Sequence, residues 1–129
     1  MTDELFDQGL KVRREVMGDA FVDKALSNQN DFNQDLQQLV TEVAWGKIWT
    51  RPGLDRATRS LLNLAMLAAL NRTQEFKGHV RGALNNGCSL EQIREVLLQV
   101  SVYCGMPAGV EAFRNAQEVI TQMEAEKQP

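Results

Sequence analysis

Helical periodicity dominates this sequence, and no segment alternates apolar and polar residues as a half-buried strand would. Apolar side chains recur at spacings of three and four residues, and Gly, Pro or Asn residues interrupt the pattern between segments. The pattern predicts helices over residues 4–17, 19–26, 31–49, 56–70, 74–84, 90–104 and 108–123. The expected fold is therefore an all-α, single-domain bundle of six or seven helices.

Length and composition limit the class of protein. A chain of 129 residues with 43% apolar and 24% charged residues fits one domain over residues 1–129, with a frayed tail over residues 124–129. The nearly apolar run 61–70 is half the ~20 residues that a membrane span needs, so we expect no membrane partner. The acidic N-terminus lacks the pattern of a signal peptide, and Cys88 and Cys104 have no metal or redox spacing. These features predict a soluble cytoplasmic protein with reduced thiols.

Positive charge gathers in one segment of an otherwise acidic chain. Residues 51–81 carry a net charge of +4, whereas residues 1–50 carry −4 and residues 82–129 carry −3. An acidic chain is a poor nucleic-acid binder, and a basic island in it suits a small anion held in a pocket. The alternative is that these cations are solvated or pair with the acidic flanks.

Several local signals mark where helices begin. Asp31 and Asp55 have the character of N-cap residues for the helices that follow them. Ser89 and Gln92 have the spacing of a capping box, and Cys88 is placed to pack against the same helix as a hydrophobic staple. Cys88 is therefore expected to be a small apolar plug in the core.

Glu75 and His79 lie four residues apart and share one face of a predicted helix. A carboxylate beside an imidazole raises its pKa and orients the ring, which suits a proton donor near neutral pH. The alternative is an ordinary exposed helix pair. His79 is the one histidine of the chain, so a mononuclear site built from several histidines cannot form within it.

Two tryptophans lie on the side of helix 31–49 opposite its aliphatic stripe. Trp45 and Trp49 share that side with Glu42, whereas the stripe consists of Leu36, Leu39, Val40 and Val43. Exposed aromatic patches usually mark contacts, so we expect the tryptophans to be buried between subunits or to roof a pocket.

Arginines on the following helix suggest an anionic partner. Arg56, Arg59 and Asn63 form a polar row on an otherwise apolar helix, and Arg51 precedes a Pro-Gly turn. A helix as apolar as residues 61–70 is expected at the centre of the fold. Arginine on such an element normally pairs with a carboxylate of the protein or of a ligand.

Five motifs together resemble the carboxymuconolactone decarboxylase family, within the alkyl-hydroperoxidase-D-like superfamily. The resemblance covers essentially the whole chain. The motifs are Arg51-Pro-Gly-Leu-Asp-Arg-Ala-Thr-Arg-Ser-Leu-Leu, Met66-Leu-Ala-Ala-Leu-Asn, Glu75-Phe-Lys-Gly-His-Val-Arg-Gly-Ala-Leu-Asn-Asn-Gly, Ile93-Arg-Glu-Val-Leu-Leu-Gln-Val and Tyr103-Cys-Gly-Met-Pro-Ala-Gly-Val-Glu-Ala-Phe-Arg. The resemblance implies an all-α fold, assembly as a homo-oligomer that is commonly a hexamer, and a carboxy-lyase that needs neither cofactor nor metal.

The redox branch of this superfamily carries a Cys-x-x-Cys pair followed four residues later by histidine. Arg72 and Glu75 occupy the two cysteine positions here, and His79 occupies the histidine position. Without either thiol, disulfide-cycling peroxidase chemistry is excluded at that site. A glutamate and an arginine there suit acid–base chemistry on an anion.

The resemblance further implies decarboxylation of γ-carboxymuconolactone to β-ketoadipate enol-lactone, in the protocatechuate branch of the β-ketoadipate pathway. On chemical grounds we expect catalytic roles for His79 as general acid and Glu75 as its orienting partner. Arg51 and Arg59 are the expected clamps for substrate carboxylates, and Trp45 the apolar neighbour of the leaving carboxylate. Arg72 and Arg81 are weaker candidates for the clamp.

Two other functions remain open at this point. One is a thiol-dependent peroxidase or reductase of the same superfamily, which the missing cysteine pair disfavours. The other is a non-catalytic oligomeric module that binds small anions, which the basic island and the tryptophan face would also permit.

Overall fold

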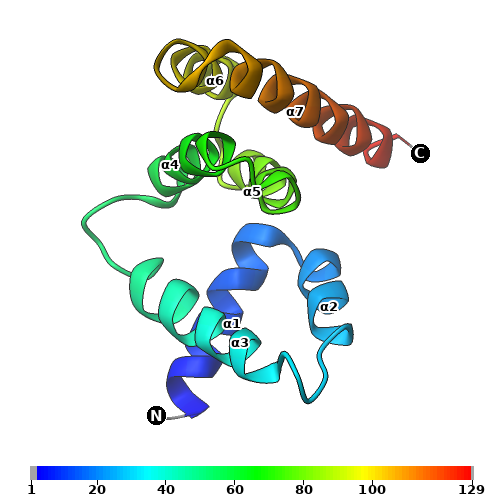
Figure 1. Cartoon of the computed structure of the whole chain (residues 1–129). Coiled ribbons are helices and arrows are strands. Elements are labelled where there is room, and N and C mark those ends of the chain that lie inside the picture. Colours follow the sequence, from blue (N-terminus) through cyan, green and yellow to red (C-terminus); the bar gives the residue numbers. More distant parts are fainter. Residues whose placement is uncertain (1–2, 129) are drawn as a thin grey trace. The chain divides into compact units, whose positions relative to one another are not determined.

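The computed structural model describes residues 3–128 and is helical, with no strand among those residues (Figure 1). Seven α-helices and one π-helix follow one another along the chain, which confirms the predicted fold class. Their bounds are α1 Asp3–Met17, α2 Asp19–Ser27, α3 Gln34–Leu39, η1 Val40–Ile48, α4 Arg56–Ala69, α5 Thr73–Asn85, α6 Leu90–Cys104 and α7 Met106–Glu126. No helix of the described chain is long and apolar enough to cross a membrane.

The helices group into two compact units, where the sequence led us to expect one compact domain. Unit 1 comprises Met1–Asp55 and unit 2 comprises Arg56–Pro129. The boundary follows the exposed turn of residues 50–55, which contains Pro52 and Gly53. A turn of this kind ends one helix before the next begins, so each unit closes around apolar residues of its own.

Unit 1 is built on close contact between α1 and the π-helix η1. A Cβ atom at Gly9 would collide with the Thr41 carbonyl oxygen and lie 2.9 Å from the Gly46 nitrogen. Glycine at position 9 therefore lets the two helix backbones touch. Beside this contact the Arg13 guanidinium, 8% exposed, donates hydrogen bonds to Gln37 Oε1 at 3.0 Å and Thr41 Oγ1 at 3.4 Å. Burial lowers the pKa of Arg13.

The predicted helix 31–49 differs from the structure in two ways. Asp31 is not its N-cap: Asn30 Oδ1 accepts hydrogen bonds from the amides of Phe32 and Asn33, so α3 begins only at Gln34. From Val40 onward the helix is a π-helix, in which the Trp49 amide donates to the Ala44 carbonyl five residues earlier.

The apolar faces of this segment are the reverse of those predicted. Trp45 and Trp49 are buried in unit 1 against α1 and α2, where they join a cluster of aliphatic residues. Of the predicted stripe, Leu36, Leu39 and Val43 are between 41% and 58% exposed, whereas Val40 packs against the tryptophan cluster. The close approach of α1 to η1 at Gly9 determines which side of the helix is covered. The prediction that a second subunit is needed to bury the tryptophans is therefore wrong.

Unit 2 packs helices α4 to α7 around one apolar core. In Figure 1, α4 and α5 form one layer of this unit and α6 and α7 form the other. The largest fully buried apolar side chains of this core are Leu64, Phe76, Val80 and Leu97. Leu62 and Met66 of α4 are 46% and 53% exposed, so α4 is not buried on all sides as predicted.

The ends of the unit 2 helices follow the sequence signals closely. The predicted capping box is present, with the Gln92 amide donating to Ser89 Oγ at 3.0 Å and the Ser89 amide donating to Gln92 Oε1 at 2.9 Å. Cys88 is 5% exposed and lies in the core, as expected of a plug. The tail expected to fray is helical as far as Glu126, whose carboxylate accepts two hydrogen bonds from Arg81. Pro129 lies outside the described residues.

Candidate active site

His79 lies on α5, half-buried, and faces Asn63 on α4. The Asn63 Nδ2 and His79 Nδ1 atoms are 3.4 Å apart. With Nδ2 as donor, Nδ1 accepts and the proton of the neutral ring lies on Nε2. A half-turn of the amide presents Oδ1 instead, which suits an imidazolium that donates from Nδ1. An amide can thus serve both protonation states of the ring.

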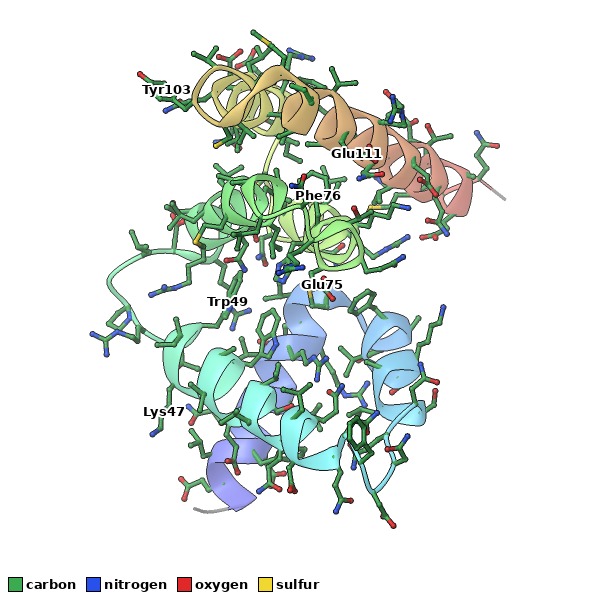
Figure 2. All side chains as sticks on the ribbon, viewed as in Figure 1. Lys47, Trp49, Glu75, Phe76, Tyr103 and Glu111 are labelled. Carbon is green, nitrogen blue, oxygen red and sulfur yellow. The ribbon has the colours of Figure 1, made fainter. Side chains whose placement is uncertain are left out.

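Glu75 lies one helical turn before His79 and is exposed. Among the described residues its carboxylate has no hydrogen bond or ion pair with the imidazole. The ring thus has a hydrogen-bond partner on α4, Asn63. Figure 2 shows Glu75 projecting from the first turn of α5, on the surface of unit 2.

Arg59 lies one turn before Asn63 on the same side of α4. The residue is partly buried, and its Nε atom is covered. A guanidinium at this depth normally has an anionic partner. Unit 2 therefore brings together three polar side chains that the sequence singled out, namely Arg59, Asn63 and His79, with Glu75 at the edge.

Arg51 and Trp45, the other two predicted site residues, belong to unit 1. Arg51 is exposed in the turn that follows η1, and its amide donates to the Ile48 carbonyl at 3.1 Å. Trp45 is 5% exposed and stacks on Trp49, with ring centroids 4.8 Å apart and 24° between the planes. Most of the Trp45 ring is thus committed to the core of unit 1.

Part of the basic segment is paired with α7. Lys77 Nζ lies 3.0 Å from Glu118 Oε2, and Arg81 grips Glu126 through two nitrogens at 2.9 and 3.1 Å. Arg81 therefore links α5 to α7, and both of its terminal guanidinium nitrogens donate to Glu126. For these two cations the alternative of pairing with the acidic flanks is confirmed.

Asn63 is the candidate site residue whose contact the sequence did not predict. It was recognised as part of a polar row, but nothing in its own helix indicates which side chain it meets on α5. Asn86 is a related case: its Nδ2 donates to the fully buried Ser60 Oγ at 2.9 Å and so joins the α5 end to α4. Within residues 3–128 no three His, Cys, Asp or Glu side chains gather as ligands of a metal would.

The sequence of the chain is similar to those of known decarboxylases. A model of the carboxymuconolactone decarboxylase family matches residues 34–118. The chain is 45% identical over 124 residues to a 4-carboxymuconolactone decarboxylase of Acinetobacter baylyi, covering 95% of this chain and 92% of the relative. It is 46% identical over 119 residues to the nitrosuccinic acid decarboxylase npaB of Metarhizium robertsii, covering 92% of this chain and 83% of the relative.

Proposed function

Because the chain belongs to the carboxymuconolactone decarboxylase family, we propose that it decarboxylates γ-carboxymuconolactone to β-ketoadipate enol-lactone. The observation that carries the proposal is 45% identity to a 4-carboxymuconolactone decarboxylase over almost the full length of both chains. The reaction belongs to the protocatechuate branch of the β-ketoadipate pathway. The two free cysteines fit a reducing compartment, and we place the enzyme in the cytoplasm.

The chemistry asks little of the protein beyond positioning and one proton. As the bond to the departing carboxylate breaks, its electron pair moves through the ring double bond to the lactone carbonyl and CO₂ leaves. The resulting dienolate oxygen must be stabilised, and the α carbon must then receive a proton. Since the lactone carbonyl accepts the electrons, the reaction requires no added cofactor. Donors aimed at the developing oxyanion usually contribute most to such a rate.

His79 is the proposed proton donor. As imidazolium it protonates the α carbon, becomes neutral, and takes a proton from solvent before the next turnover. Asn63 suits this cycle because its amide can accept from Nδ1 of the charged ring and donate to Nδ1 of the neutral one. Glu75, exposed and one turn away, is proposed to bias the ring toward the charged form by its negative charge.

The substrate carries two carboxylates, and they need different treatment. A tight grip on the departing carboxylate would stabilise the ground state and slow the loss of neutral CO₂. We therefore assign Arg51 and Arg59 to the acetate arm, which keeps its charge throughout. Trp45 is assigned to the apolar surroundings of the departing carboxylate, through the small part of its ring that the cluster leaves open.

Assembly as a homo-oligomer, most simply a hexamer, is part of the same proposal. The support is apolar surface that each chain leaves open: Leu62 and Met66 on α4, Leu70 directly after it, and Tyr103, 82% exposed at the end of α6 (Figure 2). Sedimentation at micromolar concentration should give an oligomer, and Met66→Glu should shift it toward smaller species while leaving the helix content unchanged. A monomeric wild-type chain would refute this part of the proposal.

A second candidate activity comes from the relative that acts on nitrosuccinic acid, which is as similar to the chain as the first. In γ-carboxymuconolactone and in nitrosuccinic acid, one carbon bears the departing carboxylate and a carboxymethyl arm. The same carbon is bonded to a group that accepts electrons. The acceptor is a conjugated lactone in one and a nitro group in the other. The carboxymethyl arm that both substrates share fits the proposed clamp of Arg51 and Arg59. The flat lactone ring needs more room beside His79 than the nitro group does.

One assay decides among the candidates. Purified enzyme, in buffer treated with chelator and free of thiols, is offered γ-carboxymuconolactone and, separately, nitrosuccinate, with CO₂ release and product formation followed for each. A kcat/KM at least tenfold higher for the lactone supports the proposal, and the reverse ratio assigns the second activity. If the protein binds both substrates but turns over neither, the result supports the alternative of a non-catalytic module that binds small anions.

A further inference from the structure

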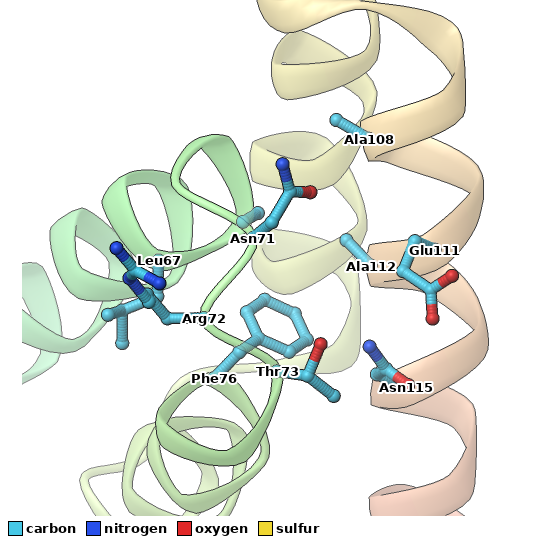
Figure 3. Close-up of a pocket in the computed structure, with 10 residues that line it drawn as sticks. Leu67, Asn71, Arg72, Thr73, Phe76, Ala108, Glu111, Ala112 and Asn115 are labelled. Atoms are coloured by element: carbon cyan, nitrogen blue, oxygen red, sulfur yellow. The ribbon is translucent and has the colours of Figure 1, made fainter.

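A small pocket lies between the start of α5 and the first half of α7, and His79 is not among the residues that line it. Figure 3 shows the turn from α4 into α5 facing α7, with Phe76 between them. The small side chains Ala108 and Ala112 line the α7 wall. The enclosed volume is about 10 Å³, which admits the centre of one water-sized atom.

The first turn of α5 lies at this pocket, which Thr73 and Phe76 line. The Phe76 amide donates to the Arg72 carbonyl at 2.8 Å, but Arg72, at the N-cap position, makes no side-chain capping hydrogen bond. Among the described residues, the amides of Thr73, Gln74 and Glu75 have no hydrogen-bond acceptor. Helix N-termini of this kind carry a partial positive charge and favour anions.

Asn115 on α7 provides the independent observation. Its side chain is 7% exposed, yet within residues 3–128 its amide has no hydrogen-bond partner. Figure 3 shows Asn115 and Thr73 pointing toward one another across the pocket. Asn115 lines the pocket, so an occupant there can accept a hydrogen bond from its N–H.

The backbone entering α5 and the nearby charges also suit an anion. Asn71 adopts a left-handed conformation, with φ of 59°, and this conformation turns the chain so that α5 starts at the pocket. Arg72 adds a positive charge at the same turn. The one acidic residue of the lining, Glu111, is paired with Arg114 at 3.2 Å, which reduces its repulsion of an anion.

We propose that this pocket is an anion site, formed by the α5 N-terminus, Thr73 and Asn115, that takes a halide ion or the leading oxygen of a carboxylate. The single-atom volume excludes a fully enclosed tetrahedral anion such as phosphate. The site is separate from the His79 cluster and does not rest on the proposed decarboxylation. Its occupant would be either a free anion from solution or the outer carboxylate of a bound substrate.

Chloride and bromide are the probes for this site. The chloride NMR linewidth, titrated against the wild-type protein, should show saturable binding, and crystals grown in bromide should show an anomalous peak within hydrogen-bond distance of the Thr73 amide and Asn115. Asn115→Leu should weaken chloride binding about tenfold, the loss expected for one hydrogen bond to an ion. Thr73→Val tests the same site from α5, and Gln122→Leu, exposed on α7, is the control.

Two outcomes overturn the proposal. One is a pocket that holds a water molecule and no bromide; the other is chloride binding that neither Asn115→Leu nor Thr73→Val weakens. Acetate and turnover then separate the two sources. If acetate displaces chloride and bromide competes with the substrate, the occupant is a substrate carboxylate. If bromide leaves KM unchanged, the occupant is a free anion. The binding measurements need no turnover, so they stand or fall apart from the proposed activity.

Discussion

Asn63 on α4 and His79 on α5 face one another with 3.4 Å between the amide nitrogen and Nδ1. This contact joins two neighbouring helices at the one imidazole of the chain. Its chemical consequence is that the partner of the imidazole is neutral and can both donate and accept.

Asn63→Leu should lower kcat about tenfold, roughly 1.4 kcal/mol, with little change in KM, because it leaves the ring in place and removes its hydrogen bond. Asn63→Asp should instead move the basic limb of the pH–rate profile to higher pH, because a carboxylate favours the charged imidazole. Steady-state kinetics across pH measure both effects. If both variants keep the wild-type profile, Asn63 does not position the ring.

His79→Gln should lower kcat by about 100-fold or more, the usual range for loss of a general acid, while circular dichroism remains that of a folded helical protein. A folded variant with near-normal kcat would remove His79 from the mechanism. Glu75→Gln should lower the pH of the basic limb, since it removes the negative charge near the ring. An unaltered pH profile would argue against any coupling of Glu75 to His79.

Arg51→Lys and Arg59→Lys should each raise KM, and at least one should lose ~1–3 kcal/mol in kcat/KM, because lysine cannot reproduce a two-point grip on a carboxylate. Arg81→Lys is the matched control, since the Arg81 guanidinium is held by Glu126. Should both test variants behave as this control does, the clamp consists of other residues.

Trp49→Ala should destabilise the chain by about 3–5 kcal/mol, the range for removing a large buried aromatic. Trp49 is 7% exposed and stacks on Trp45, so its loss opens a cavity in unit 1. Urea unfolding measures the effect, and sedimentation of the folded variant should match wild type. Dissociation without loss of stability would show instead that the tryptophans act at an interface.

Glu126→Gln should lower the melting temperature at neutral pH by releasing the end of α7 from α5. The hydrogen bonds from Arg81 lower the pKa of Glu126 below its ordinary value of 4.5. The pair therefore stabilises the fold above that ordinary value, and its contribution disappears as pH falls through the lowered pKa. The difference in melting temperature between wild type and variant should accordingly vanish in acid. Glu124→Gln, also exposed near the end of α7, is the control, and an equal effect of the two would contradict the assignment.

Local signals in the sequence determined most of the helix boundaries. Gly18 ends α1 with a φ of 93°, and Ser89 with Gln92 starts α6 through hydrogen bonds that span three residues. Interactions of such short range depend on neighbouring residues alone, which is why they can be recognised without a fold. The family resemblance could also be recognised from the sequence alone, because it rests on long motifs.

The tertiary structure decided which faces are buried and which side chains meet. A π-helix at Val40–Ile48 and a backbone contact at Gly9 put the tryptophan side inward, and no periodicity in the segment itself distinguishes the two sides. His79 contacts Asn63, which lies sixteen residues earlier in the chain. Glu126 accepts its hydrogen bonds from Arg81, 45 residues earlier. Contacts at these separations depend on how helices pack, which a helical pattern read one segment at a time does not contain.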